Sequence, residues 1–285
     1  MNHPDYNSPA ELKAVLEANG FSMQKKFGQN FLINGAARQR LADALDVHDG
    51  MSVWEIGPGL GAVTGILLEK GANLTVFEID RGFSALITQY FDDYAQKGRF
   101  HLVEGDVMRT WRAALDKGLP LRVFGNLPYN IAAAFIADTI EEGVRFDSCV
   151  FTVQKEVAQR MCARHGSADY SSFSVLCQWA YDLRPVIDLS GGNFWPKPNV
   201  DSRAVMLTKK TDWPGCNDPK AFVTLQRALF SSRRKNIRNN LTAYLNSSDA
   251  ALAFLEKAGI SPEKRAEVLS VREMLHLSDV ISGGA

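Results

Sequence analysis

The chain has 285 residues, of which 46% are hydrophobic and 22% charged, and its formal net charge is zero. These values are typical of a soluble globular protein with one large domain and a smaller one. The polar stretch 1–13 contains no apolar run, and no other stretch approaches the length of a membrane span, so we expect a cytoplasmic protein with no signal peptide and no membrane partner. The cysteines are widely and irregularly spaced, which argues against a disulfide framework and against a zinc site, and we expect no metal.

The first segment, 1–24, is predicted to be a lead-in with one short helix over 10–18, whose Leu12, Val15 and Leu16 share a face. A basic and aromatic stretch follows at 25–32, too irregular for a helix, and then an amphipathic helix over about 35–45. Four basic residues and no acid lie between residues 18 and 42. The stretch 25–32 is therefore either an ordinary surface loop or a loop that packs over a ligand or touches phosphates.

The clearest local signal begins at residue 51. An apolar strand (51–56) leads into the glycine turn 57–61, a helix is expected over 62–70, and a second strand over 74–77 ends at Glu78. Small residues let the backbone approach a ligand, and an acid at the tip of the second strand can accept hydrogen bonds from two ribose hydroxyls. The pattern predicts a nucleoside-containing cofactor, although it also fits a dinucleotide site with Ala62 in the third place of the motif.

A third strand, 100–103, is followed by Asp106. A carboxylate at this strand tip can accept a hydrogen bond from the exocyclic amine of adenine, as in methyltransferases that use S-adenosylmethionine. The alternative is that Asp106 only caps the next helix.

The fourth strand, near 121–124, runs into the hexapeptide 124–129, and the carboxyl end of a strand is where open α/β sheets bind ligands. The Asn126 amide offers an acceptor and donors, Pro128 leaves the Leu127 carbonyl free of a following N–H, and Tyr129 offers a flat face. This set suits a planar heterocycle that carries an amino group. A plain strand-to-loop turn is the alternative, because Asn and Pro are common in turns.

A helix over about 131–142 and a fifth strand over 148–153 complete an alternation that predicts a doubly wound, largely parallel sheet. After a helix at 170–180, short strands at 186–189 and 204–207 could finish the sheet as a hairpin-like pair. The intervening loop, 193–202, is rich in aromatic residues and proline and shows no strand or helix periodicity. Its Phe194 is a candidate for a second aromatic face opposite Tyr129.

Near 208–219 the composition changes to Lys, Asp, Pro and Gly, and we predict a domain boundary at about residue 210. Beyond it the pattern is helical, with a capping box at Ser270 and Glu273 and a helix start at Ser261-Pro262. Five basic residues and no acid lie between residues 227 and 240. Such a run would repel itself without an anionic partner, which favours nucleic acid over a merely solvated surface.

Eight motifs then occur in order between residues 25 and 241: KFGQNFL at 26–32, EIGPGL at 55–60, FEID at 77–80, GD at 105–106, GNLPYNI at 125–131, QKEV at 154–157, FWPKPNVDS at 194–202 and RRKNIRNNL at 233–241. Together they resemble the small-subunit ribosomal RNA adenine dimethyltransferases, the KsgA-type family. The departures are modest. Ser171 stands where the family usually has Gly, and Trp195 stands at a position that is often small or polar.

The resemblance implies an α/β fold: a Rossmann-like S-adenosylmethionine-dependent methyltransferase sheet over 25–210, followed by a small all-helical RNA-binding domain over 211–285. The residues implied to contact the cofactor are Gln29, Asn30, Leu32, Glu55, Gly57, Gly59, Glu78, Asp106 and Asn126. Among them, Glu78 is expected on the ribose, Asp106 on the adenine and Glu55 near the methionine end.

The catalytic set implied by the resemblance is Asn126, Leu127, Pro128, Tyr129 and Phe194. Asn126 and the Leu127 carbonyl would accept hydrogen bonds from the N6 amine of the target adenine, while Tyr129 and Phe194 would hold the extruded ring. The basic residues expected to bind RNA are Lys25, Lys26, Arg233, Arg234, Lys235 and Arg238.

The expected function is an rRNA adenine N6,N6-dimethyltransferase that modifies adenosines near the 3′ end of 16S rRNA, in the small ribosomal subunit or its precursor. This is a ribosome biogenesis role, and we expect a monomer. The alternatives are a large-subunit rRNA methyltransferase of the erythromycin-resistance type, a non-catalytic assembly factor with a vestigial site, and a nicotinamide dehydrogenase. The intact set of Glu78, Asp106 and Asn126 speaks against a vestigial site, and a dehydrogenase leaves the basic helical segment unexplained.

Overall fold

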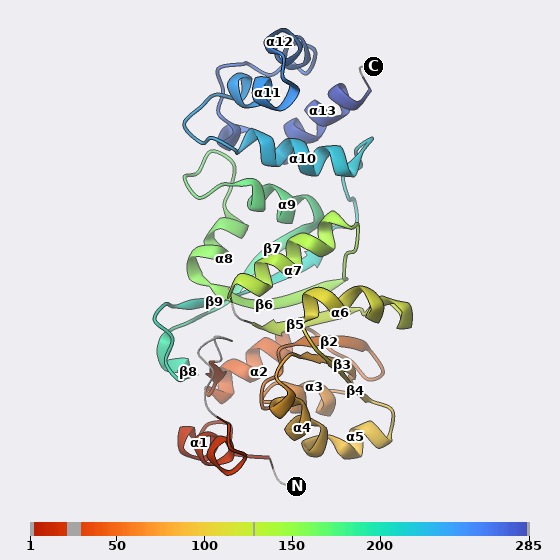
Figure 1. The fold of residues 1–285 in the computed structure, drawn as a ribbon, viewed down its shortest axis with the longest axis vertical. Helices are drawn as coiled ribbons and strands as arrows, with labels where there is room; N and C mark the ends of the chain where they lie inside the picture. Colours follow the sequence, from red (N-terminus) through yellow and green to blue (C-terminus); the bar gives the residue numbers. More distant parts are fainter. Residues whose placement is uncertain (1–2, 22–29, 128, 284–285) are drawn as a thin grey trace. The chain divides into compact units, whose positions relative to one another are not determined.

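A computed structural model describes residues 3–21, 30–127 and 129–283, apart from the side chains of Tyr129 and Asn130 (Figure 1). The chain divides into two compact units. The sheet unit comprises Met1–Phe135, Phe146–Ala158 and Arg184–Thr208. The helical unit comprises Ile136–Arg145, Gln159–Leu183 and Lys209–Ala285.

The central feature is a seven-stranded sheet with the strand order β4-β3-β2-β5-β6-β9-β7. The strands β4, β3, β2, β5 and β6 are parallel, and β9 is antiparallel to β6. The predicted largely parallel sheet is therefore confirmed, including its finish by two late strands. The bounds are β2 Ser52–Ile56, β3 Asn73–Glu78, β4 Phe100–Glu104, β5 Arg122–Asn126, β6 Ser148–Gln154, β7 Tyr181–Leu189 and β9 Ser202–Lys209.

Alternating side chains of these strands pack on opposite faces of the sheet. In β2, Val53 joins a core cluster with residues of α2 and α3. The next residue, Trp54, instead makes an edge contact with Phe77 and a tilted contact with Phe146. Burial on both faces explains why β6, whose first six residues are all buried, is a continuous run rather than an alternating one.

Most helices begin at side-chain caps. Ser8, Asn34, Asp80 and Asp106 each accept a hydrogen bond from a backbone N–H in the first turn of the helix that follows. The helices are α1 Pro9–Ala18, α2 Gly35–Ala44, α3 Thr64–Glu69, α4 Arg81–Tyr90, α5 Asp92–Gln96, α6 Val107–Ala114, α7 Tyr129–Glu141 and α8 Lys155–Cys162.

The protein has a second, two-stranded sheet that was not predicted. Strand β1, Phe31–Leu32, pairs antiparallel with β8, Phe194–Trp195. Both segments were predicted as irregular loops, because neither has a strand periodicity of its own. Their pairing joins residues about 160 positions apart, and the rings of Phe31 and Trp195 stack with centroids 6.2 Å apart.

The helical unit contains α9 Ser172–Ala180, α10 Pro219–Leu229, α11 Ile237–Leu245, α12 Ser248–Lys257 and α13 Val271–Ser282. The capping box of Ser270 and Glu273 is confirmed. The predicted helix start at Ser261-Pro262 is wrong. The Lys264 N–H donates back to the Ser261 carbonyl, and the Lys264 carbonyl accepts from Ile237 of α11, which fixes a turn there. Among the described residues, no helix combines the length and the apolar character needed to span a membrane.

Candidate active site

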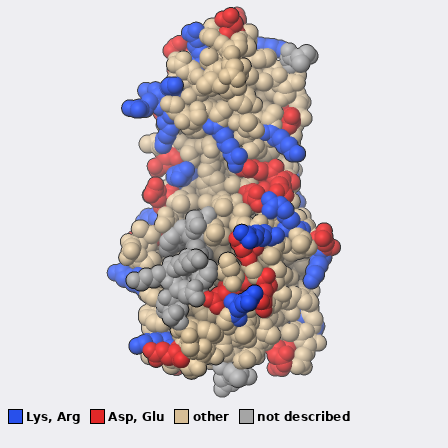
Figure 2. All heavy atoms as spheres, viewed as in Figure 1, with Lys and Arg blue, Asp and Glu red and all other residues tan. Residues whose placement is uncertain are grey.

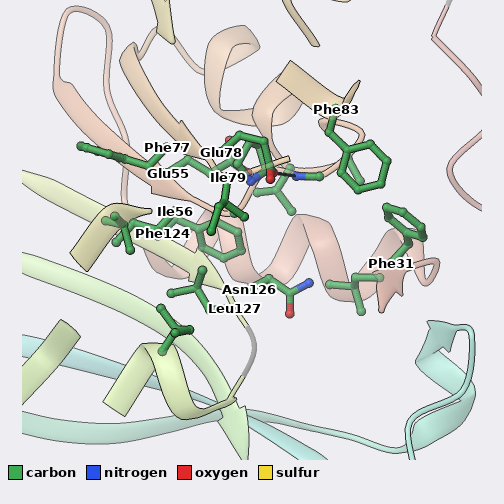
Figure 3. A pocket seen from close by; sticks show the side chains of 18 of the residues that line it. Phe31, Glu55, Ile56, Phe77, Glu78, Ile79, Phe83, Phe124, Asn126 and Leu127 are labelled. Atoms are coloured by element: carbon green, nitrogen blue, oxygen red, sulfur yellow. Dashed lines mark hydrogen bonds between the residues drawn. The ribbon is translucent and has the colours of Figure 1, made fainter. Parts of the chain in front are cut away.

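The sheet unit contains a cavity of about 240 Å³ at the carboxyl ends of its parallel strands (Figure 3). Four neighbouring strands each contribute a residue that lies just beyond the strand's carboxyl end. These residues are Gly57 after β2, Ile79 after β3, Asp106 after β4 and Leu127 after β5. Ligands bind at this edge in open α/β sheets because the loops there diverge.

The glycine turn forms one wall of the cavity. Gly57, Gly59 and Gly61 have φ angles of 70°, 58° and 89°, which side chains disfavour. A Cβ atom on Gly57 would lie 2.8 Å from the end of the Leu127 side chain, which would have to shift, so this contact adds to the strain that the positive φ angle imposes on any other residue. Helix α3 begins at Thr64, two residues later than predicted, and the turn itself rather than a long helix faces the cavity.

Glu78 joins the tip of β3 to the glycine turn. Its carboxylate accepts hydrogen bonds from the Gly59 N–H at 3.1 Å and from the Asp80 N–H at 2.8 Å. Only 5% of the residue is exposed, and burial raises the pKa of Glu78 to about 7 although these hydrogen bonds oppose the shift. The side chain therefore lies poised between its charged and neutral forms near neutral pH.

Glu55 lines the same cavity and is almost fully buried at 1% exposure. The Thr64 hydroxyl donates to it at 2.7 Å. Burial, with a smaller repulsion from Glu78, raises the pKa of Glu55 to about 8. In the ligand-free protein Glu55 is thus mainly protonated at neutral pH and can donate as well as accept a hydrogen bond.

Asp106 caps helix α6, as the alternative interpretation predicted, and it also lies in the cavity wall. One carboxylate oxygen caps α6 by accepting from the Met108 N–H at 2.9 Å. The residue also lines the cavity, at the tip of the strand next to Glu78. The cap fixes the orientation of the carboxylate, so the same residue can serve the helix and a ligand.

The acceptors predicted for an amino heterocycle lie at the end of β5. Figure 3 shows the Asn126 side chain extending into the space between Leu127 and Phe31, within the cavity that Glu78 also lines. Phe194 lines the cavity from β8 and is buried, with 4% exposure. Pro128 lies outside the described residues, and Tyr129 begins α7 without a described side chain.

Three of the predicted cofactor residues lie in the stretch 25–32, and the structure describes two of them, Asn30 and Leu32. Asn30 and Leu32 line the cavity, and Leu32 belongs to β1. Gln29, Lys25 and Lys26 lie outside the described residues.

Several aromatic and aliphatic residues of the wall were not predicted. Phe31 and Phe83 make an edge contact with centroids 5.8 Å apart and stand on one side of the cavity in Figure 3, while Ile56 and Phe124 stand on the other. Ile79, directly after Glu78, is 47% exposed at this site. The amphipathic pattern of 81–90, with Asp80 as its cap, could have indicated the position of Phe83.

The basic segment of the helical unit, Arg233–Lys235, is exposed. Although the run 227–240 contains no acid, acidic residues from other parts of the chain lie beside it. Arg233 lies 3.8 Å from Glu267, and Arg227 pairs with Glu141. Within the residues that the structure describes, Arg234 and Lys235 form no ion pair. Figure 2 shows Lys and Arg side chains projecting from the surface of this unit.

The chain is similar to known proteins over nearly its whole length. A family model described as ribosomal RNA adenine dimethylase matches residues 20–282. A Treponema denticola protein named ribosomal RNA small subunit methyltransferase A is 49% identical over 99% of this chain and 97% of its own length. A protein of the same name from Treponema pallidum is 44% identical over 98% of each chain.

Two solved structures share the fold. A dimethyladenosine transferase from Plasmodium falciparum has a TM-score of 0.72 and 24% identity, covering 86% of this chain and 94% of that one. The 23S rRNA methyltransferase ErmE has a TM-score of 0.64 and 20% identity, covering 89% and 100%. The predicted Rossmann-like methyltransferase fold and the predicted family resemblance are both confirmed, and the chain belongs to the ribosomal RNA adenine dimethylase family.

Proposed function

We propose that this protein transfers methyl groups from S-adenosylmethionine to N6 of adenosines near the 3′ end of 16S rRNA, in the small ribosomal subunit or its precursor. The observation that carries the proposal is the placement of Asn126 and Leu127 in one cavity with Glu78, Asp106 and the glycine turn. A pair of acceptors for an amine thus lies beside a site suited to an adenosine-containing cofactor.

The residues around the cavity fit S-adenosylmethionine. When bound, this cofactor supplies a methyl group that its sulfonium makes electrophilic. We propose that Glu78 accepts from the ribose hydroxyls, that Asp106 accepts from the adenine amine, and that Glu55 faces the methionine end. The absence of side chains at Gly57 and Gly59 leaves room for the cofactor to approach the backbone closely.

Asn126 and Leu127 would orient the target amine. The lone pair of adenine N6 is delocalised into the ring, so the amine is a poor nucleophile until it becomes tetrahedral. The Asn126 side-chain oxygen and the Leu127 carbonyl, by accepting its two N–H groups, would favour that form. Positioning of this kind supplies roughly 7 to 11 kcal/mol of a reaction barrier. No strong base is required, because the methylated ammonium is itself acidic and loses its proton to water.

The adenine must leave its stack to reach the cavity, which costs a few kcal/mol. Stacking on an aromatic ring returns about 1 to 3 kcal/mol per base. We propose that Phe194 and Tyr129 supply this stacking. Phe194 meets the requirement for a fixed ring, because its strand is paired with β1 and its side chain is held in the core cluster.

The RNA would be held largely by charge. We propose that the segment 211–285 acts as the RNA-binding domain and that Lys25, Lys26, Arg233, Arg234, Lys235 and Arg238 contact phosphates. Exposure of Arg234 and Lys235 supports this assignment. We further propose that the protein acts as a cytoplasmic monomer, in which the RNA rather than a second subunit covers the basic surface.

The test is incubation of the protein with methyl-labelled S-adenosylmethionine and unmethylated small or large ribosomal subunits, followed by nucleoside analysis. We expect N6,N6-dimethyladenosine in the small-subunit RNA alone. Label in the large subunit would instead assign the protein to the erythromycin-resistance type, and label in neither would favour a non-catalytic assembly factor.

A further inference from the structure

The N-terminal helix packs behind the wall of the cavity. Leu12 and Leu16 of α1 are 1% and 3% exposed and belong to one cluster with Phe31, Leu60 and Phe83. Phe31 and Phe83 line the cavity, and Leu60 lies within the glycine turn. The helix does not line the cavity itself, but it packs against three residues that shape the proposed cofactor site.

A single hydroxyl connects the segment before this helix to the glycine turn. The Tyr6 hydroxyl donates to the Leu60 carbonyl at 2.8 Å, across 54 positions of sequence. Leu60 lies between Gly59, whose N–H donates to Glu78, and Gly61. Because glycine is conformationally permissive, a turn that contains three of them needs outside contacts to stay in one geometry. The Tyr6 hydrogen bond is one such contact.

A buried guanidinium connects the same segment to β1. Arg38 of α2 is only 6% exposed. It donates to the Leu32 carbonyl at 2.8 Å, to the Tyr6 carbonyl at 3.3 Å and to the Asn7 side-chain oxygen at 3.0 Å. Leu32 lines the cavity, so Arg38 connects β1 to Tyr6, and the Tyr6 hydroxyl in turn contacts the glycine turn.

The Tyr6 segment is ordered by its own side chains. One Asp5 carboxylate oxygen accepts from both the backbone N–H and the side-chain amide of Asn7, each at 2.9 Å. The Asp5 N–H donates to Glu11 at 2.8 Å, and Ser8 caps α1. These local bonds fix the place where Tyr6 and Asn7 meet Arg38, so the segment can act as a rigid support.

We infer that Tyr6 and Arg38 are positioning residues for the S-adenosylmethionine site, which they hold in its binding geometry by joining the glycine turn and β1 to the N-terminal helix. The inference rests on the proposed function. Neither residue lines the cavity, so both act through Leu60 and Leu32. Loss of either contact lowers the fraction of protein with the competent geometry, and the measured cofactor affinity falls by that fraction.

The first test is Tyr6→Phe, which removes the hydroxyl and keeps the ring. We expect the Kd for S-adenosylmethionine, measured by titration calorimetry on the full chain, to rise roughly 2- to 12-fold, the range for one hydrogen bond. The KM for the cofactor should rise in parallel, while kcat at saturating cofactor stays within about twofold. Tyr94→Phe, at a tyrosine of α5 whose ring contacts Lys97 and Arg99, is the matched control and should leave Kd unchanged.

The second test compares two arginines on one helix. Arg38→Met should weaken cofactor binding, whereas Arg40→Met should not, although the Arg40 side chain also donates to a backbone carbonyl, that of Val186 at 2.9 Å. Hydrogen exchange in the absence of cofactor adds an independent readout. In Tyr6→Phe we expect faster exchange at residues 59–63 and unchanged exchange in β5 and β6.

If the wild type binds S-adenosylmethionine and both Tyr6→Phe and Arg38→Met bind it with unchanged affinity, the inference is wrong but the proposed function is not affected. A lower kcat at unchanged KM, or faster exchange across the whole sheet, would also overturn the inference, because a general loss of stability would then explain the effect. No binding of S-adenosylmethionine by the wild type would overturn the proposed function and the inference with it.

Discussion

The cavity of the sheet unit and the basic segment of the helical unit differ in how their charged residues are held. Glu55 and Glu78 are buried and fixed by hydrogen bonds from Thr64, Gly59 and Asp80. Arg234 and Lys235 are exposed. A reaction needs fixed geometry, whereas attraction to a polyanion needs only summed charge. Substitutions in the cavity should therefore have large effects, and those in the basic segment small, salt-dependent ones.

The largest effect is expected at Asn126. Asn126→Ala removes one of the two proposed acceptors for the adenine amine, and kcat should fall roughly 100- to 1,000-fold, as for other fixed polar groups that act in a transition state. Cofactor binding should be weakened but retained. Asn73→Ala is the control, since Asn73 lies at the amino end of β3, whereas the cavity lies at the carboxyl ends of the strands. A methyl-transfer rate near that of the wild type in Asn126→Ala would contradict the proposed role of Asn126 as an acceptor.

Glu78 should give the next largest effect. Glu78→Gln places an amide N–H group against the Gly59 or the Asp80 N–H, and it removes a charged acceptor for the ribose. We expect the Kd for S-adenosylmethionine to rise roughly 10- to 150-fold, the range for hydrogen bonds to a charged group. The control is Glu104→Gln, because Glu104 pairs with Glu78 in register on β4 but is exposed. Calorimetry that showed equal affinities for the two variants would contradict the assignment.

The buried carboxylates also predict a dependence of stability on pH. The pKa of Glu55 rises from its usual 4.5 to about 8 on folding, so the folded state keeps a proton that the unfolded state has lost. The resulting stability is complete below pH 4.5 and is lost as the pH rises toward 8. For Glu55 the loss is roughly 2 kcal/mol between pH 5 and 7, from 1.36 kcal/mol per pKa unit. Glu78 acts in the same direction over a narrower window.

Urea unfolding of the ligand-free protein at pH 5, 6 and 7, with Glu55→Gln as the reference, measures this contribution. The reference is needed because burial lowers the pKa of His3, which makes stability rise with pH in the same window. The free energy of unfolding should fall more steeply with pH in the wild type than in the variant. Equal slopes would mean that Glu55 is charged in the folded protein.

The smallest effect is expected in the basic segment. Arg234→Ala combined with Lys235→Ala removes two exposed charges, so the slope of log affinity for RNA against log salt should decrease by about 1.4 to 1.8. Affinity should fall for all RNA sequences alike. Lys220→Ala with Arg272→Ala removes the same charge from α10 and α13 and is the matched control. If the two double variants behave alike, net charge rather than this segment attracts the RNA.

The strands and the residues at their tips could be predicted from sequence because their signals are local. Glu78, Asp106 and Asn126 each follow an apolar run, and parallel strands bring such positions to one edge. The pairing of β1 with β8, the contact of Tyr6 with Leu60 and the approach of Glu267 to Arg233 could not be predicted. Each joins residues far apart in sequence, and nothing in the composition of either partner specifies the other.

The most direct test of this separation between chemistry and RNA binding is single-turnover methyl transfer to unmethylated small subunits, with the protein in excess and its concentration increased. We expect the Arg234→Ala, Lys235→Ala variant to reach the wild-type rate once the protein saturates the subunits, because only its affinity is changed. We expect Asn126→Ala to stay slow at every concentration. A rate that recovers in Asn126→Ala, or one that stays low in the basic-segment variant at saturation, would contradict the separation of chemistry from RNA binding.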